Sequence, residues 1–214
     1  NSNLSVRVTD EFMQAVEKDA KWMTHAVTSG ETMDEHSARE LMDLIAEGTR
    51  ICGDPGLQYH STVNRWHTCP NSGPINASNP CSEYMFVDDS ACNLASLNLM
   101  KFRKDDGSID IEGLKKAIRI FIIAQEILVD NGSYPDKAIA VNSHLFRALG
   151  LGYANLGSLM MSLALPYDSD QARAIASAIS AIMTGTAYSA SAEIASIKEP
   201  FDQFEKNKDS MLKV

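Results

Sequence analysis

The segment from residue 111 to residue 131 restricts the fold most, because the helix that it predicts is apolar on nearly all sides. Asp110 is a suitable N-cap, and Asn131-Gly132 followed by Pro135 is a typical helix end. One side carries Leu114, Ala117, Ile118, Phe121, Gln125 and Leu128, and it is widened by Ile120, Ile122, Ile123 and Ile127. We therefore expect a helix packed between the layers of a larger fold.

Other periodic segments predict a helix-rich α/β protein. Helices are expected over residues 10–28 after the cap Thr9, over residues 38–52 after the capping box of Ser37 and Glu40, and over 156–165 and 170–196. The second of these should bury a stripe that includes Cys52 as a small core residue; its members are Leu41, Leu44, Ile45, Ile51 and Cys52. Short strands are expected at 84–87 and 148–153, and helices outnumber strands.

Gly150 and Gly152 lie in the second of these strands. The third glycine of a dinucleotide-binding fingerprint is missing, so we interpret the pair as a place where another part of the chain approaches the backbone closely.

Charge and cysteine content exclude several classes of protein. The 214 residues carry a formal net charge of −9 with no basic run, which argues against a nucleic-acid partner or an anionic membrane surface. No apolar run approaches the roughly 20 residues of a membrane-spanning helix. Four cysteines are too few for a disulfide framework, so we expect thiols in the cytoplasm. The chain begins at Asn1 without Met and ends at Leu-Lys-Val, so we expect a piece of a longer protein.

The stretch from Asn79 to Glu83 is the candidate reactive centre. Pro80 fixes its own φ and moves Asn79 out of the α region, which predicts a loop tip. Alternation of side chains would then place an amide, the thiol of Cys81 and a carboxylate on one side. A second thiol, Cys92, follows eleven residues later, after a turn at Asp88-Asp89-Ser90, and could return toward Cys81.

Alternatives remain open from the residues alone. The long loop over residues 54–80 contains His67 and Cys69, which could bind zinc, although no standard ligand spacing supports this. It is otherwise a polar loop held by Trp66. A cysteine-dependent hydrolase would use Cys81 with His60 or His67 as its base. A helical interaction module with passive cysteines is the non-enzymatic alternative.

The run from Asn79 to Leu99 resembles the finger loop of ribonucleotide reductases, and its long form is similar to the adenosylcobalamin-dependent (class II) enzymes. The resemblance extends over most of the chain, through the runs at residues 5–12, 52–56, 64–70, 150–155 and 205–207. His60 departs from the family pattern, which has an acidic residue there.

The resemblance implies a role for each residue of the loop. Cys81 would form the thiyl radical that takes the 3′ hydrogen of a ribonucleotide, Glu83 would accept the 3′-hydroxyl proton, and Asn79 would hold the ribose hydroxyls. The backbone from Asn79 through Pro80 and Ser82 to Glu83 would line the substrate. Cys92 would be one half of the redox disulfide, with its partner upstream of Asn1.

The resemblance also implies a fold and partners. Residues 1–214 would be a fragment of the catalytic domain, part of a ten-stranded α/β barrel with a central finger loop at about 76–92, and without a complete second domain. The whole protein would be a ribonucleoside-diphosphate reductase with adenosylcobalamin bound mostly outside this fragment, nucleotide effectors, an external dithiol such as thioredoxin, and a homodimeric assembly. The fragment alone should be inactive.

Overall fold

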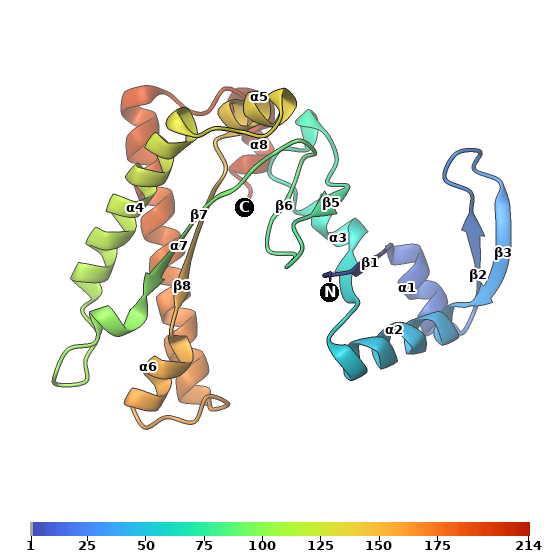
Figure 1. Cartoon of the computed structure of the whole chain (residues 1–214), viewed down its shortest axis with the longest axis horizontal. Helices are drawn as coiled ribbons and strands as arrows, with labels where there is room; N and C mark the ends of the chain where they lie inside the picture. The colour runs from blue at the N-terminus through green and yellow to red at the C-terminus, as the bar shows by residue number, and fades with distance from the viewer. Residues whose placement is uncertain (1) are drawn as a thin grey trace. The chain divides into compact units, whose positions relative to one another are not determined.

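The computed structural model describes residues 2–214, which divide into two compact units (Figure 1). The first unit contains residues 1–88 and 206–214, and the second contains residues 89–205. No helix within residues 2–214 combines the length and the apolar character that crossing a membrane requires.

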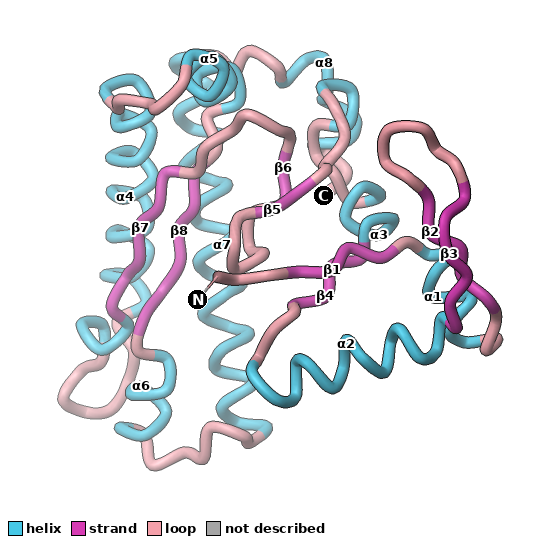
Figure 2. The backbone as a smooth tube through the Cα atoms, turned by 45° about the vertical axis from the view of Figure 1, so that its right-hand side comes forward, coloured by secondary structure: helices cyan, strands magenta, loops and turns pink. Residues whose placement is uncertain are grey.

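The first unit is built around a parallel pair of strands joined by a helical connection. Strand β1 (Ser5–Val8) pairs in parallel with β4 (Gly56–Tyr59). Between them lie α1 (Asp10–Glu17), the antiparallel pair β2 (Lys21–His25) and β3 (Thr32–Ser37), and α2 (Ala38–Cys52). The unit continues through α3 (His60–Arg65), a 3-10 turn (Pro70–Ser72), and the short hairpin of β5 (Ala77–Ser78) and β6 (Met85–Phe86), which Figure 2 shows in magenta.

The second unit is also built around a parallel pair of strands joined by a helical connection, but its elements are longer. Strand β7 (Asn93–Asn98) pairs in parallel with β8 (Leu149–Ala154), and a 3-10 turn (Leu99–Phe102), α4 (Ile111–Asn131) and α5 (Lys137–Phe146) lie between them in the chain. Helix α4 packs on both strands and on α7 (Asp170–Lys198), as Figure 1 shows. Helix α6 (Leu156–Ser162) precedes α7, and α8 (Phe204–Met211) returns the chain to the first unit.

The expected caps and the long helix are confirmed. The side chains of Thr9, Ser37 and Asp110 each accept a backbone hydrogen bond at the start of α1, α2 and α4, and Ser169 does the same at the start of α7. Helix α4 has the predicted bounds, and Gly53 ends α2 in the left-handed conformation. The expected strand at Gly150 and Gly152 is β8.

The helix predicted over residues 10–28 is wrong beyond residue 17. Asp19 adopts a left-handed conformation (φ 50°), which short polar side chains tolerate, and the chain turns back as the β2–β3 hairpin. Trp22 packs edge-on against Phe12, with ring centroids 5.2 Å apart. The apolar spacing is thus satisfied by a strand folded onto α1, while Val27 is fully exposed.

The predicted burial of α2 and α4 is only partly confirmed. On α2, Ala38 is buried, but Leu44, Ile51 and Cys52 are exposed, because only the first turns of the helix pack against α1 and β3. On α4 one face is buried, whereas Ile120, Ile123 and Ile127 are exposed on the other. Among the methionines of α6 and α7, Met160 and Met183 are buried and Met161 is 74 % exposed.

The structure supports the α/β class and leaves the barrel untested. The strands within residues 2–214 form four two-stranded sheets, of which β1–β4 and β7–β8 are parallel. Parallel pairs with helical connections are the repeating unit of α/β barrels, but these residues do not form a closed barrel.

Candidate active site

The stretch around Cys81 forms a tight turn at the tip of the β5–β6 hairpin. The Ser82 amide donates to the Asn79 carbonyl (3.0 Å), so Asn79 to Ser82 make a four-residue turn with Pro80 second, where its fixed φ fits best. Cys81 does not have a positive φ, whereas Ser82 does (φ 66°). This sequence of conformations matches a type I turn followed by a left-handed residue, a common hairpin connection.

The turn changes how the reactive groups come together. The Tyr84 amide donates to the Asn79 side-chain oxygen at 3.0 Å, so Asn79 and Tyr84 pair across the base of the turn. The arrangement of the three side chains on one side stays a prediction, because Ser82 with its positive φ interrupts a regular alternation. The amide, thiol and carboxylate of Asn79, Cys81 and Glu83 all lie in the loop that joins β5 to β6, with the exposed thiol at the corner of the turn.

A buried glutamine of β4 holds the turn in place through side-chain hydrogen bonds. Gln58 is 7 % exposed, and its Nε2 donates to Ser78 Oγ (2.7 Å) and Ser82 Oγ (2.8 Å). Ser78 Oγ donates in turn to the Asn79 carbonyl at 2.7 Å. The turn is thus attached to the β1–β4 sheet at both of its ends. Sequence reasoning missed Gln58, because the contact joins residues 20 and 24 positions apart.

The segment before the hairpin is held by polar side chains rather than by Trp66. Trp66 is 65 % exposed, so the predicted anchor is wrong. Asn64 instead donates to the Ile75 carbonyl (3.1 Å) and accepts from the Ile75 amide (2.9 Å). Arg7 also donates to the Ile75 carbonyl at 3.1 Å, and burial lowers the pKa of its guanidinium.

The histidines of this segment are engaged elsewhere than at Cys81. His67 is buried, its Nε2 lies 3.0 Å from the Gly73 carbonyl, and its Nδ1 accepts from the Cys69 amide. Burial lowers the pKa of His67, partly offset by the bond to Gly73, and burial raises the pKa of the Cys69 thiol. Both ring nitrogens are therefore used within the protein, which removes His67 as a zinc ligand. His60 Nδ1 lies 3.3 Å from Arg7 Nη1. Neither ring is placed as the base that a thiol hydrolase needs.

Cys92 lies in the second unit, directly before β7, and is half-buried. A Cβ atom on Gly150 would lie 2.7 Å from Cys92 Sγ and 2.5 Å from Leu94 Cδ2, closer than real Cβ contacts. The close approach expected at Gly150 is confirmed, and what approaches is the thiol of Cys92. A cavity of about 270 Å³ adjoins this position and is lined in part by Cys92, Asn93, Val129, Tyr134 and Ser143. The approach of Cys92 to Cys81 stays a prediction, since the two lie in different units.

Comparison with known proteins identifies the family. Residues 1–213 match the family described as "Ribonucleotide reductase, barrel domain". The chain is 56 % identical over 216 residues to a vitamin B12-dependent ribonucleotide reductase of Rhodopirellula baltica, and 50 % identical over 211 residues to one of Streptomyces clavuligerus. It is 32 % identical over 202 residues to a vitamin B12-dependent ribonucleoside-diphosphate reductase of Mycobacterium tuberculosis.

These alignments cover 100 %, 97 % and 94 % of this chain, but 21 %, 22 % and 29 % of the respective relatives. The chain therefore belongs to the ribonucleotide reductase family and matches its barrel domain. It spans about a fifth of the length of the first two relatives.

Proposed function

We propose that the protein containing this chain reduces ribonucleotides to 2′-deoxyribonucleotides by a thiyl-radical mechanism and so supplies DNA precursors. The proposed substrates are the ribonucleoside diphosphates. The observation that carries the proposal is the position of Cys81, whose exposed thiol lies at the corner of the turn in the β5–β6 loop that also contains Asn79 and Glu83. The names of the relatives support the reaction, and their B12 dependence supports adenosylcobalamin as the radical source.

The groups of the turn divide the first steps between them. The Cys81 thiyl takes the 3′ hydrogen atom of the ribose, and Glu83 accepts the 3′-hydroxyl proton as the 2′-hydroxyl leaves as water. Asn79 Oδ1 already accepts from Tyr84, so its amide nitrogen is the group that would hold the ribose hydroxyls. The backbone of residues 79–83, with Pro80 and Ser82, lines the substrate in this proposal.

Cys92 supplies electrons together with a second cysteine outside this chain. Two thiols lose two electrons and two protons and form a disulfide, while the nucleotide gains a hydrogen at C2′ and releases water. The 3′ hydrogen returns from Cys81, so the thiyl radical is regenerated. An external dithiol such as thioredoxin then reduces the disulfide.

The residues present fit a cobalamin-dependent reaction in which the Cys81 thiol is the group that loses a hydrogen atom. When bound, adenosylcobalamin supplies the organic radical that removes the hydrogen atom from the thiol. Cys81 is exposed at the tip of its turn and is accessible to such a radical. Residues 2–214 contain no group of three His, Cys, Asp or Glu side chains that could hold a metal ion. We assign Cys81 as the group acted upon, and we propose from the family resemblance that most cofactor contacts lie outside this chain.

The remaining expectations belong to the whole protein. We propose that β1, β4, β7 and β8 are strands of a ten-stranded α/β barrel in which the loop at about 76–92 is the central finger, which would shield the radical from water. A homodimer, nucleotide effectors and a cytoplasmic location are proposed on the same basis. The chain alone should lack activity.

Replacement of Cys81 in the full-length protein tests the proposal. Cys81→Ser keeps the size of the side chain but cannot form the thiyl radical, so we expect no deoxyribonucleotide in an assay with adenosylcobalamin and a dithiol. Cys52→Ser is the matched control, because Cys52 is also exposed but lies at the end of α2. Turnover by Cys81→Ser would contradict the proposal, and acyl transfer from Cys81 would favour a hydrolase.

A further inference from the structure

Gln125 is a buried amide on a helix face that is otherwise apolar. It is 2 % exposed and shares the inner face of α4 with Leu114, Ile118, Ile122 and Val129. Its Nε2 donates to two backbone carbonyls, Asn93 on β7 at 2.7 Å and Gly150 on β8 at 2.9 Å. Two carbonyl acceptors fix the orientation of the amide, since the flipped amide would place oxygen against oxygen.

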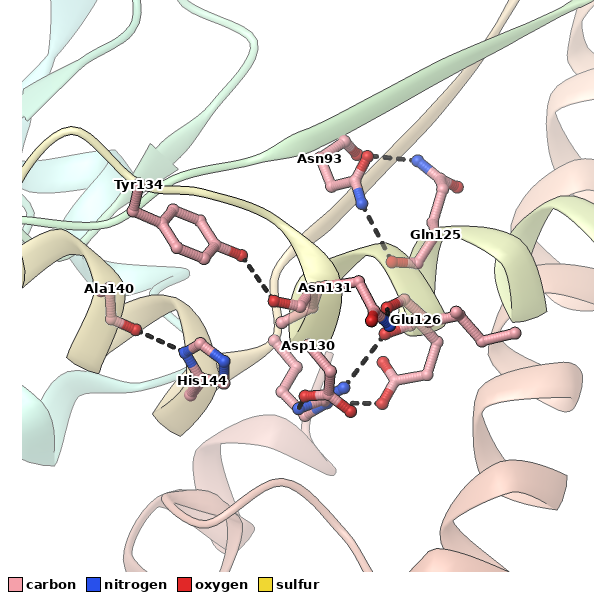
Figure 3. A network of polar contacts seen from close by, with 11 residues as sticks. Asn93, Gln125, Glu126, Asp130, Asn131, Tyr134, Ala140 and His144 are labelled. Atoms are coloured by element: carbon pink, nitrogen blue, oxygen red, sulfur yellow. Dashed lines mark hydrogen bonds and ion pairs between the residues drawn. The ribbon is translucent and has the colours of Figure 1, made fainter.

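The contact is reciprocal, as Figure 3 shows. Asn93 Nδ2 donates to the main-chain carbonyl of Gln125 at 2.9 Å, so one residue of α4 and the first residue of β7 are joined by two hydrogen bonds. The Oε1 atom of Gln125 is buried and has no hydrogen-bond partner within residues 2–214. A buried polar atom without a partner is unfavourable, so an apolar residue would suit the packing of this face better.

Both carbonyls held by Gln125 belong to residues that adjoin Cys92. Asn93 follows Cys92 directly in the chain, and a Cβ added to Gly150 would lie only 2.7 Å from Cys92 Sγ. A movement of either backbone segment would therefore move the sulfur. Disulfide formation tolerates only a narrow range of Cα separation and dihedral angle, so the stability of a disulfide depends on such movements.

We propose that Gln125 is a positioning residue for the redox thiol: its side-chain amide clamps the Asn93 and Gly150 carbonyls so that Cys92 Sγ is held in the geometry that closes the disulfide. This inference rests on the proposed function, in which Cys92 donates electrons. It adds a residue of α4, distant in sequence from both cysteines, to the determinants of that step.

The test uses the full-length protein with Gln125→Met, which keeps the length of the side chain and removes both donors. Equilibration in mixtures of reduced and oxidised dithiothreitol, followed by alkylation and mass spectrometry, gives the fraction of Cys92 in the disulfide. We expect the dithiol–disulfide equilibrium to shift by about 10-fold or more toward the dithiol. In a single turnover without external reductant, product formation should slow while substrate affinity stays within about 2-fold.

The matched control is Asn207→Leu. Asn207 is as buried as Gln125 and also bonds backbone and side-chain groups, but it belongs to the first unit, whereas β7 and β8 belong to the second. The Asn207→Leu substitution should destabilise the protein without shifting the dithiol–disulfide equilibrium of Cys92. Equal shifts in both variants, or a shift below about 2-fold in Gln125→Met, would overturn the inference.

Two further variants keep the test decisive. If Gln125→Met does not fold, Asn93→Ala removes only the return bond to the Gln125 carbonyl and should shift the equilibrium in the same direction by a smaller amount; an unchanged equilibrium would overturn the inference. Cys92→Ser separates the two proposals. If it leaves single-turnover product unchanged, the redox role of Cys92 fails. If it abolishes product while Gln125→Met behaves as the wild type, only the clamp fails.

Discussion

The two thiols singled out by the sequence are held in different ways. Cys81 is exposed at the corner of a turn whose own hydrogen bonds, Ser82 to Asn79 and Tyr84 to Asn79, fix its shape. Cys92 is half-buried before a parallel strand pair, packed on Gly150, and its surroundings are fixed by Gln125, 32 residues away from Asn93. The first site is mainly local in sequence, and the second depends on tertiary contacts. Substitutions at the two sites should therefore have different effects on activity and stability.

The largest difference is expected for chemistry at the turn. Glu83→Gln in the full-length protein should keep the turn and remove the proton acceptor, lowering kcat by about 10²–10⁴-fold, the usual contribution of a general base. Steady-state assays would measure this. Glu35→Gln is the control, because Glu35 is an exposed carboxylate on β3 whose ion pair with Lys21 is also exposed. A loss below about 10-fold for Glu83→Gln would remove it from the proposed mechanism.

Gly150→Ala probes the packed thiol, and we expect a loss of about 1–3 kcal/mol in the free energy of unfolding. The new Cβ would meet Cys92 Sγ and Leu94 Cδ2, both side-chain ends, so the thiol must move and its alkylation rate should change. Urea denaturation and timed alkylation measure the two effects. Gly152→Ala in the same strand is the control, because its Cβ would meet only Ser96 Oγ at 3.8 Å. Identical behaviour of the two variants would show that Cys92 is not held by this packing.

Gln58→Leu probes the tertiary support of the turn. It removes the donor to Ser78 and Ser82, which should cost about 1–2 kcal/mol in unfolding free energy and increase protease cleavage within residues 79–83. Gln14→Leu, at an exposed position of α1, should change neither. Unchanged cleavage in Gln58→Leu would mean that the turn is fixed by its local bonds alone, which would strengthen the contrast with Cys92.

The smallest effect is a pH dependence of the first unit. Burial lowers the pKa of His67, so the folded protein binds fewer protons than the unfolded chain below the usual histidine pKa of about 6.5. Stability should therefore fall as the pH decreases from that value toward the lowered pKa of the folded state. His67→Gln should flatten this dependence in thermal unfolding series, and His25→Gln, on the exposed face of β2, should retain it. A slope unchanged in His67→Gln would assign it to another group.

The sequence predicts correctly those structural features that are determined by neighbouring residues. The turn at Pro80, the caps at Thr9, Ser37 and Asp110, and the bounds of α4 all depend on residues within one or two turns of backbone. The predicted helix over residues 10–28 is wrong beyond residue 17, because the spacing of apolar residues alone does not distinguish a helix from a hairpin that folds back onto a helix. The sequence does not predict helix α5, because Pro135 indicates only the end of the preceding helix.

The supporting residues of the site could not be found from the sequence. The Gln58 and Gln125 amides reach partners 20 to 32 residues away, and no local pattern marks them. Gln125 appeared in the predicted helical face as one polar member of an apolar set. The one available signal was that a glutamine on such a face must find hydrogen-bond partners if it is buried.

The first unit is completed by residues from the far end of the chain. Asn207 is 1 % exposed; its Oδ1 accepts from the Asn71 amide and its Nδ2 donates to Ser72 Oγ, across 136 and 135 residues of sequence. During synthesis, the segment that leads into the Cys81 hairpin is therefore made long before the amide that anchors it. The second unit, continuous from residue 89 to residue 205, can complete its own contacts first. The order in which the ribosome synthesises the segments of this chain therefore differs from the order in which their native contacts can form.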